Sequence, residues 1–101
     1  MATFVVLGNW TAEGAKAYAD APARAKANAD AATAMGGRIV ATYWTLGQYD
    51  FVSIIEAPSD ESLTVGMLVN AARGFSHTET LRAFTMSEFE GIVGQAKAAG
   101  G

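Results

Sequence analysis

The chain has 101 residues, enough for one domain; half of them are hydrophobic and 17% are charged, which excludes a disordered acidic chain. The formal net charge is −3 and no basic run occurs, so we expect no nucleic-acid partner. The absence of cysteine excludes disulfides, thiolate catalysis and cysteine-ligated metals.

The first predicted elements are a strand and two helices. Residues 3–9 are mostly β-branched or aromatic over the length of a strand. Alanines then recur over residues 15–31, and this stretch favours helix because alanine is the best helix former and a poor strand former. Pro22 suits a first helical turn but not a helix interior. We therefore expect a short helix near 12–19 and a longer one over 22–35.

The second half of the chain begins with a predicted hairpin, in which Gly47 is available for a positive φ angle. The last helix is predicted from Thr85 and Glu88, which have capping-box spacing. The elements expected here are strands over residues 38–45, 50–57 and 77–84, a helix from Ser59 or Asp60 to Arg73, a short last helix ending near Gln95, and a flexible tail over 96–101. Residues 1–95 are then a single domain.

The order of these elements, β-α-β-β-α-β, predicts a ferredoxin-like α+β fold. Right-handed crossovers favour a four-stranded antiparallel sheet in the order 4-1-3-2, with both long helices on one face. The first strand is apolar on both sides, however, with Phe4 and Val6 on one and Val5 and Leu7 on the other. A sheet face in water alternates apolar with polar residues, so we expect a second copy to cover the open face. The alternative is a monomer whose last helix folds over that face.

Several segments resemble the GYD-domain family. The family is named for a Gly-x-Tyr-Asp segment, matched here by Gly47, Tyr49 and Asp50. Three further stretches are similar to it: Phe4-Val-Val-Leu-Gly-Asn-Trp-Thr11, Ile55-Glu-Ala-Pro58 and Thr78-Glu-Thr-Leu-Arg-Ala-Phe-Thr85. The resemblance implies a small, mostly bacterial ferredoxin-like protein allied to the dimeric α/β barrels, and it implies no established activity.

Strand polarity predicts that several candidate residues meet at one edge of the sheet. The first two strands run opposite to the last two, so the ends of the first pair meet the beginnings of the second pair. The residues at this edge are Asn9, Trp10, Tyr43, Trp44, Tyr49, Asp50 and His77, and Glu79 shares a strand face with His77. Aromatic walls suit flat apolar ligands, and a few polar groups orient them. We therefore predict that Asn9, Trp10, Tyr43, Trp44, Tyr49 and Glu79 bind a ligand.

His77 and Asp50 are the candidate catalytic residues, because a histidine beside a carboxylate is suited to act as a general base near neutral pH. The alternative reading is structural: Asp50 accepts hydrogen bonds within its own turn, the two tryptophans close the core, and His77 has no chemical role. One histidine and no cysteine provide no metal site of ordinary spacing, and we expect no cofactor.

Three functions remain open from the sequence. The first is a homo-oligomeric module that holds a small, partly aromatic molecule. The second, by analogy with the dimeric α/β barrels, is a cofactor-independent oxygenase or isomerase with His77 as base. The third is a purely structural oligomer. No signal-peptide n-region follows Met1, and no apolar run reaches the ~20 residues that span a bilayer, so we expect a cytoplasmic protein without a membrane partner.

Overall fold

The computed structural model describes residues 1–100, and they follow the predicted order of strands and helices. The elements are β1 (Ala2–Trp10), α1 (Ala12–Lys16), a 3₁₀ turn η1 (Tyr18–Asp20), α2 (Ala21–Ala34), β2 (Arg38–Trp44), β3 (Phe51–Ala57), α3 (Asp60–Arg73), β4 (Ser76–Ala83) and α4 (Met86–Gly100). The strands form one antiparallel sheet in the order β2-β3-β1-β4. Read from the other edge, this is the predicted order 4-1-3-2.

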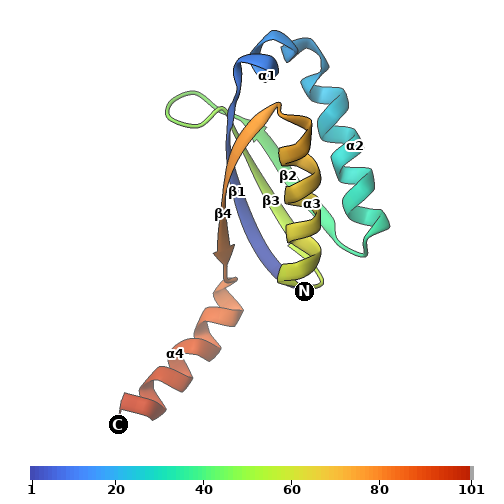
Figure 1. Ribbon diagram of the computed structural model, residues 1–101. Helices are drawn as coiled ribbons and strands as arrows, with labels where there is room; N and C mark the ends of the chain where they lie inside the picture. The colour runs from blue at the N-terminus through green and yellow to red at the C-terminus, as the bar shows by residue number, and fades with distance from the viewer. Residues whose placement is uncertain (101) are drawn as a thin grey trace.

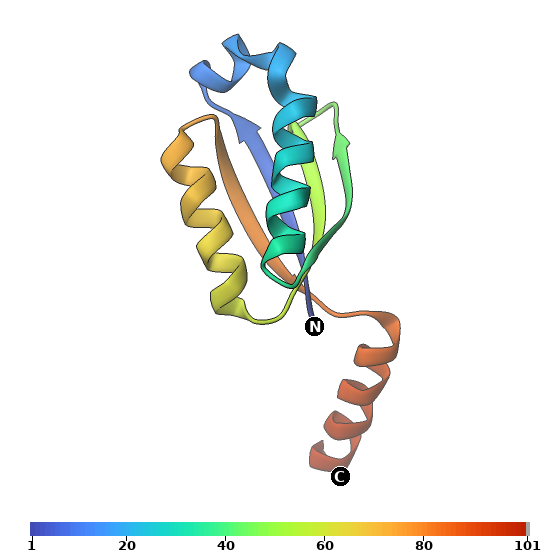
Figure 2. The same ribbon diagram turned by 90° about the vertical axis from the view of Figure 1, so that its right-hand side faces the viewer.

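The two long helices lie on one side of the sheet. Figure 1 shows α2 and α3 together on that side, and in Figure 2 they lie in front of the strands. The opposite side carries no helix of its own, because α4 leads away from the end of β4 instead of folding back (Figure 1). This placement contradicts the alternative of a monomer whose last helix covers the open face.

The predicted helix caps are present. The Ser59 hydroxyl accepts from the Ser62 N–H at 3.1 Å at the start of α3. At the start of α4, the Thr85 N–H donates to Glu88 Oε1 at 2.8 Å, while the Glu88 N–H donates to Thr85 Oγ1 at 3.1 Å. These reciprocal bonds make the capping box that the spacing of the two residues predicts.

Some element boundaries differ from those expected. The first helical segment is divided into α1 and the turn η1. The last helix continues to Gly100 instead of ending near Gln95. Residues 96–100, expected as a flexible tail, are therefore helical, since alanines favour continuation of a helix that has already started.

The core lies between the sheet and the two long helices. It contains Phe4 and Val6 from β1, Ile55 and Ala57 from β3, and Leu63 from α3. Phe4 and Val6 are only 4% and 2% exposed, and burial alternates along β1 from residue to residue. This period of two is the pattern of a strand with a single covered face.

Candidate functional site

The predicted site residues reach one end of the sheet, but they are divided between its two faces. Residues directly opposite each other in an antiparallel sheet share a face. Trp10 pairs with Ser76 and Trp44 with Phe51, in the set of residues that faces the helices. Asn9 pairs with His77, and Tyr43 with Val52, in the set on the open face. The aromatic wall expected from strand polarity is thus two separate groups.

The division follows from the alternation of side chains along each strand, and a bulge in β2 decides which of Tyr43 and Trp44 faces the helices. Ile39 pairs with Ile55 but Ala41 pairs with Ile54, so the register shifts by one residue between them. A shift of one residue exchanges the two faces for everything that follows in the strand. As a result, Tyr43 lies on the open face and Trp44 faces the helices.

Asp50 holds the end of β1 to the loop between β2 and β3. Its Oδ2 atom accepts from the Trp10 N–H at 2.9 Å, and its own N–H donates to the Gly8 carbonyl at 2.8 Å. The Asp50 carbonyl in turn accepts from the Thr45 N–H at 2.9 Å. The carboxylate therefore bonds beyond its own turn, to a strand 40 residues away in sequence. This contact is a structural anchor.

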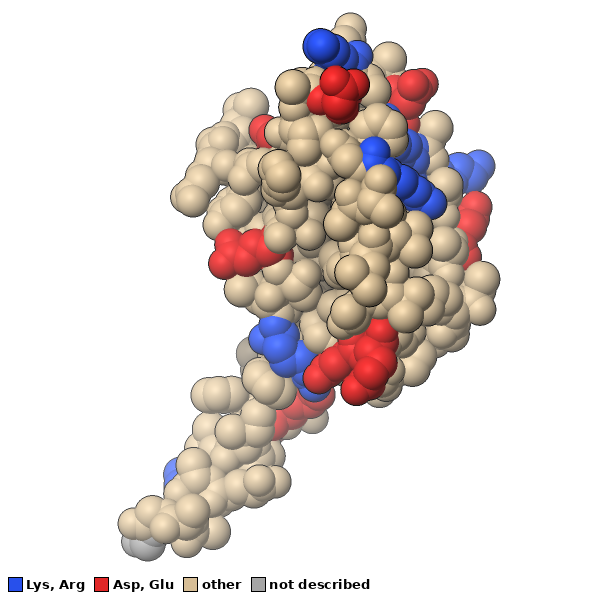
Figure 3. Space-filling view, in the orientation of Figure 1, with Lys and Arg blue, Asp and Glu red and all other residues tan. Residues whose placement is uncertain are grey.

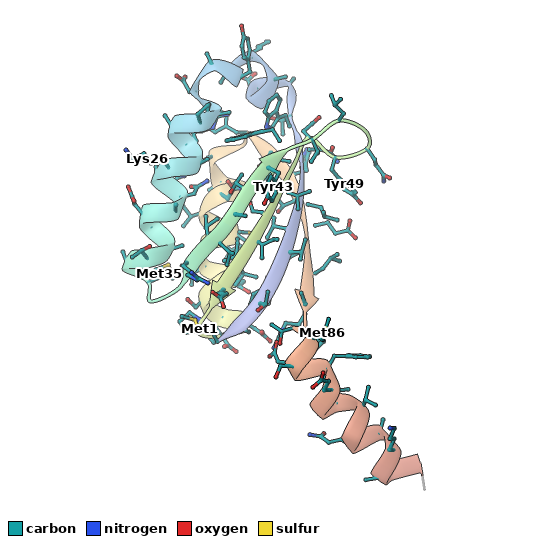
Figure 4. The ribbon with its side chains drawn as sticks, turned by 180° about the vertical axis from the view of Figure 1, so that it is seen from behind. Met1, Lys26, Met35, Tyr43, Tyr49 and Met86 are labelled. Carbon is teal, nitrogen blue, oxygen red and sulfur yellow. The ribbon has the colours of Figure 1, made fainter. Side chains whose placement is uncertain are left out.

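The loop that precedes Asp50 extends toward the open face. The Tyr49 hydroxyl donates to Glu79 Oε2 at 2.9 Å, and Glu79 lies opposite Leu7 on the open side of β4. This hydrogen bond, together with the negative charge of Glu79, raises the pKa of Tyr49 above its ordinary value. Figure 4 shows Tyr43 on β2, Tyr49 in the loop, and Met86 at the other end of the sheet.

His77 is exposed on β4, and the hydrogen bonds of residues 1–100 include none from its side chain. The structure therefore does not join His77 to Asp50 or to Glu79. Within the same residues, no group of histidine, aspartate and glutamate side chains has the arrangement of a metal site. None of their helices is long and apolar enough to cross a membrane.

The open face carries a band of apolar side chains. Pairing places Val5 opposite Ile54 and Leu81, and Leu7 opposite Val52. Leu81 is 45% exposed, and Tyr43 beside the band is 60% exposed. Glu79, opposite Leu7 on β4, marks the polar edge of this band.

Two hollows lie on the other side of the sheet, under the helices. The smaller, about 80 Å³, contains the helix-facing aromatic residues Trp10, Trp44 and Phe75 in its lining. The larger, about 190 Å³, lies between α2, α3 and the sheet. The prediction missed this larger cavity. Its signal in the sequence is the scarcity of large side chains on α2, together with Gly66 in the middle of α3.

Comparisons with known proteins show which sequences the chain is similar to. The GYD-domain family model matches residues 4–93. A curated protein of Thermus thermophilus, named glutamine synthetase and cystathionine beta-lyase binding protein, is 38% identical over 89 residues, which span 87% of this chain and 94% of that protein. No solved structure matches the chain.

Proposed function

The chain belongs to the GYD-domain family, and we propose that it is a homo-oligomeric binding module that pairs through its open sheet face and holds other proteins. The observation that carries this proposal is the uncovered apolar band on the sheet. Burial of such surface is worth about 25 cal/mol per Å² removed from water, so a partner on this face gives a large favourable term. A second copy offers the same band, which makes a two-fold pairing self-complementary. The expected pairing is that of a dimeric α/β barrel.

Two segments flank the open face and support a partner there. The loop of residues 45–50 and helix α4 both leave the sheet on the side away from α2 and α3 (Figure 1). The loop is tied down at Asp50 and through Tyr49 to Glu79. The loop therefore lies at one end of the open face and α4 at the other. A second copy bound to this face contacts these two segments as well as the strands.

Helix α4 needs contacts that its own domain does not supply. It has 15 residues, which is only the upper end of the length, about 12–15 residues, below which isolated helices are marginal in water. Gly91 and Gly94 weaken it further. Its apolar residues Phe89 and Ile92 are 56% and 39% exposed, and Figure 3 shows little charge along the helix. We expect α4 to pack against the second copy.

A separate surface is suited to a protein partner. Val65, Leu68 and Val69 form an apolar stripe along α3, where they are 48%, 66% and 48% exposed, and Val65 and Val69 also line the rim of the larger hollow. Spacing of i, i+3 and i+4 places them on one side of the helix. The relative from Thermus thermophilus is named for binding glutamine synthetase and cystathionine beta-lyase. We propose that this chain also binds enzymes of these kinds, through the α3 stripe.

The oxygenase or isomerase hypothesis receives no support from the contacts of its proposed base. His77 is exposed without a hydrogen bond among the described residues, while the Asp50 carboxylate is already engaged by Trp10. No side-chain hydrogen bond among the described residues therefore orients His77 for proton abstraction. The binding module is therefore the preferred proposal.

A matched pair of variants tests the pairing. Leu81→Lys introduces a charge in the apolar band, and we expect it to shift the protein to a monomer in analytical ultracentrifugation. Leu68→Lys makes the same change at an exposed leucine on the opposite side of the molecule and should leave the mass unchanged. Circular dichroism confirms that both variants are folded. An unchanged mass for folded Leu81→Lys would exclude the open face as the contact surface.

Partner binding is tested with purified proteins. Glutamine synthetase and cystathionine β-lyase from the same organism are passed separately over the immobilised module. We expect retention of at least one of them, and we expect Leu68→Lys to weaken it because the charge interrupts the α3 stripe. Failure to retain either enzyme would contradict the proposed partners, and it would leave the oligomer result unaffected.

A further inference from the structure

The cavity between α2, α3 and the sheet is large enough for an aromatic ring. Its volume is about 190 Å³, and apolar side chains dominate its lining. Val6 and Ile55 lie at its floor, and Met35, Leu63 and Met67 belong to the helices and their ends around it. For comparison, an engineered apolar cavity of about 150 Å³ in another protein binds benzene. The space is open to solvent at its rim, where Met35 is 42% and Val69 is 48% exposed.

The space exists because small residues line the helices. Ala31 and Ala32 face it from α2, and Gly66 faces it from α3. A Cβ atom placed on Gly66 would meet nothing within 4 Å. No neighbouring atom is therefore close enough to Gly66 to require glycine at this position. A larger residue here would fill the cavity and also favour the helix, since glycine is among the poorest helix formers.

One end of the cavity is polar and positively charged. Arg73, at the end of α3, donates to Asn28 Oδ1 on α2 at 3.0 Å, and both residues line the cavity. The ion pairs of residues 1–100 do not include Arg73, so no acidic side chain of that part of the chain neutralises it. The guanidinium group has five N–H donors, which leaves several for a ligand.

A second polar group lies on the cavity floor. Ser53 is 9% exposed, and its hydroxyl lies 3.1 Å from the Thr42 hydroxyl. Either oxygen is able to donate in that pair, so one hydroxyl hydrogen remains to be directed elsewhere. Ser53, Asn28 and Phe51 also line the smaller hollow, which extends the space toward Trp10 and Trp44.

From this arrangement we propose that the cavity between α2 and α3 binds an aromatic carboxylate. The ring lies among the apolar side chains over β1 and β3, and the carboxylate accepts hydrogen bonds from Arg73 at the open end. Planar bidentate contact with carboxylates is the recognition that arginine favours. This site lies on the opposite side of the sheet from the proposed oligomer contact, and it does not depend on it.

The probe for this site is 2-naphthoate, a two-ring aromatic carboxylate, with neutral 2-naphthylmethanol as its uncharged counterpart. Isothermal titration calorimetry measures the affinity, and amide chemical-shift changes in NMR spectra locate the site. We expect saturable binding of 2-naphthoate, with the largest shifts at residues of α2 and α3 that line the cavity. The absence of binding, or shifts confined to the open face, would overturn the proposal.

Two variants make the test specific. Gly66→Leu fills the cavity, and we expect it to abolish binding while keeping or raising the melting temperature. Ala72→Leu, an exposed position on the same helix outside the cavity lining, is the matched control and should bind as the wild type does. Arg73→Gln should weaken 2-naphthoate about tenfold, the loss expected for a charged hydrogen bond, and leave 2-naphthylmethanol unchanged. Unaltered binding to folded Gly66→Leu, or equal losses for both probes in Arg73→Gln, would contradict the assignment.

Discussion

The two faces of the sheet use the same strands but differ in how they are covered. On β1, Phe4 and Val6 are packed under the helices, whereas their neighbours Val5 and Leu7 are only half-buried on the open side. Both sets are equally apolar in character. The difference indicates that a single chain buries the apolar side chains on one face of its sheet and leaves those on the other face partly exposed. Burial of the open-face side chains requires a partner. The two faces therefore contribute differently to the stability of the isolated chain.

The largest expected effect is on the free energy of unfolding, and it differs between a substitution on the covered face and one on the open face. Phe4→Ala removes a side chain that is 4% exposed, and we expect a loss of about 3–5 kcal/mol in the free energy of unfolding. Leu81→Ala removes a side chain that is 45% exposed on the open face. Its cost to the isolated chain should be well below that of Phe4→Ala, and its main effect should be on association. Urea denaturation at several protein concentrations measures both. Similar losses of unfolding free energy for the two variants at low protein concentration would contradict the proposed difference between the faces.

The loop at the open-face end is the next test. Gly47 has a φ angle of +105°, as its place in the hairpin predicts, and the β-branched side chain of valine tolerates this region poorly. We expect Gly47→Val to destabilise the protein by about 1–3 kcal/mol. A Cβ atom there would meet nothing within 4 Å, so the cost is conformational rather than steric crowding by neighbours. If chemical denaturation shows no loss in the free energy of unfolding of Gly47→Val, the loop adopts another conformation in solution.

A smaller effect is expected at the anchor between the loop and β1. Asp50→Ala removes the acceptor of the Trp10 N–H, and the loss should be about 1–3 kcal/mol because that donor is left without a partner. Asp50→Asn keeps an oxygen in the same place and should cost less. Thermal unfolding compares the two variants. Equal losses would show that the negative charge matters more than the hydrogen bond to Trp10.

The smallest effect concerns Tyr49 on the open-face side. Its hydrogen bond to Glu79 raises its pKa, so the bond's contribution to stability is fully present below the ordinary tyrosine pKa of about 10 and is lost as the pH rises through the raised value. Glu79→Gln should lower the pKa of Tyr49 toward the ordinary value. Ultraviolet titration of the wild type and of Glu79→Gln, each compared with its Tyr49→Phe counterpart, isolates this group. Identical Tyr49 titration curves would show that the pair is not formed.

The fold was largely predictable because its signals are local. The glycine of the hairpin loop, the capping box of Thr85 and Glu88, and the alanine-rich helix each depend on residues close in sequence. The sheet order follows from those elements and the handedness of crossovers. The direction of α4 was not predictable in this way, because no local rule decides whether a helix returns to its own sheet.

The candidate site was predicted only in part. Strand polarity correctly gathers the aromatic and polar residues at one end of the sheet. It cannot assign their faces, because the bulge between Ile39 and Ala41 decides whether Tyr43 or Trp44 turns toward the helices. The cavity under α2 and α3 exists because the side chains that line it are small. No sequence motif marks such an empty space. The roles of His77, Asn9 and the other predicted residues remain predictions.

The central claim is that the chain does not exist alone, and the mass of the wild-type protein in solution tests it most directly. Sedimentation equilibrium at micromolar concentration should give at least twice the chain mass of 10.5 kDa. A single species at 10.5 kDa would contradict the account, because the apolar band of the open face would then be stable in water without a partner.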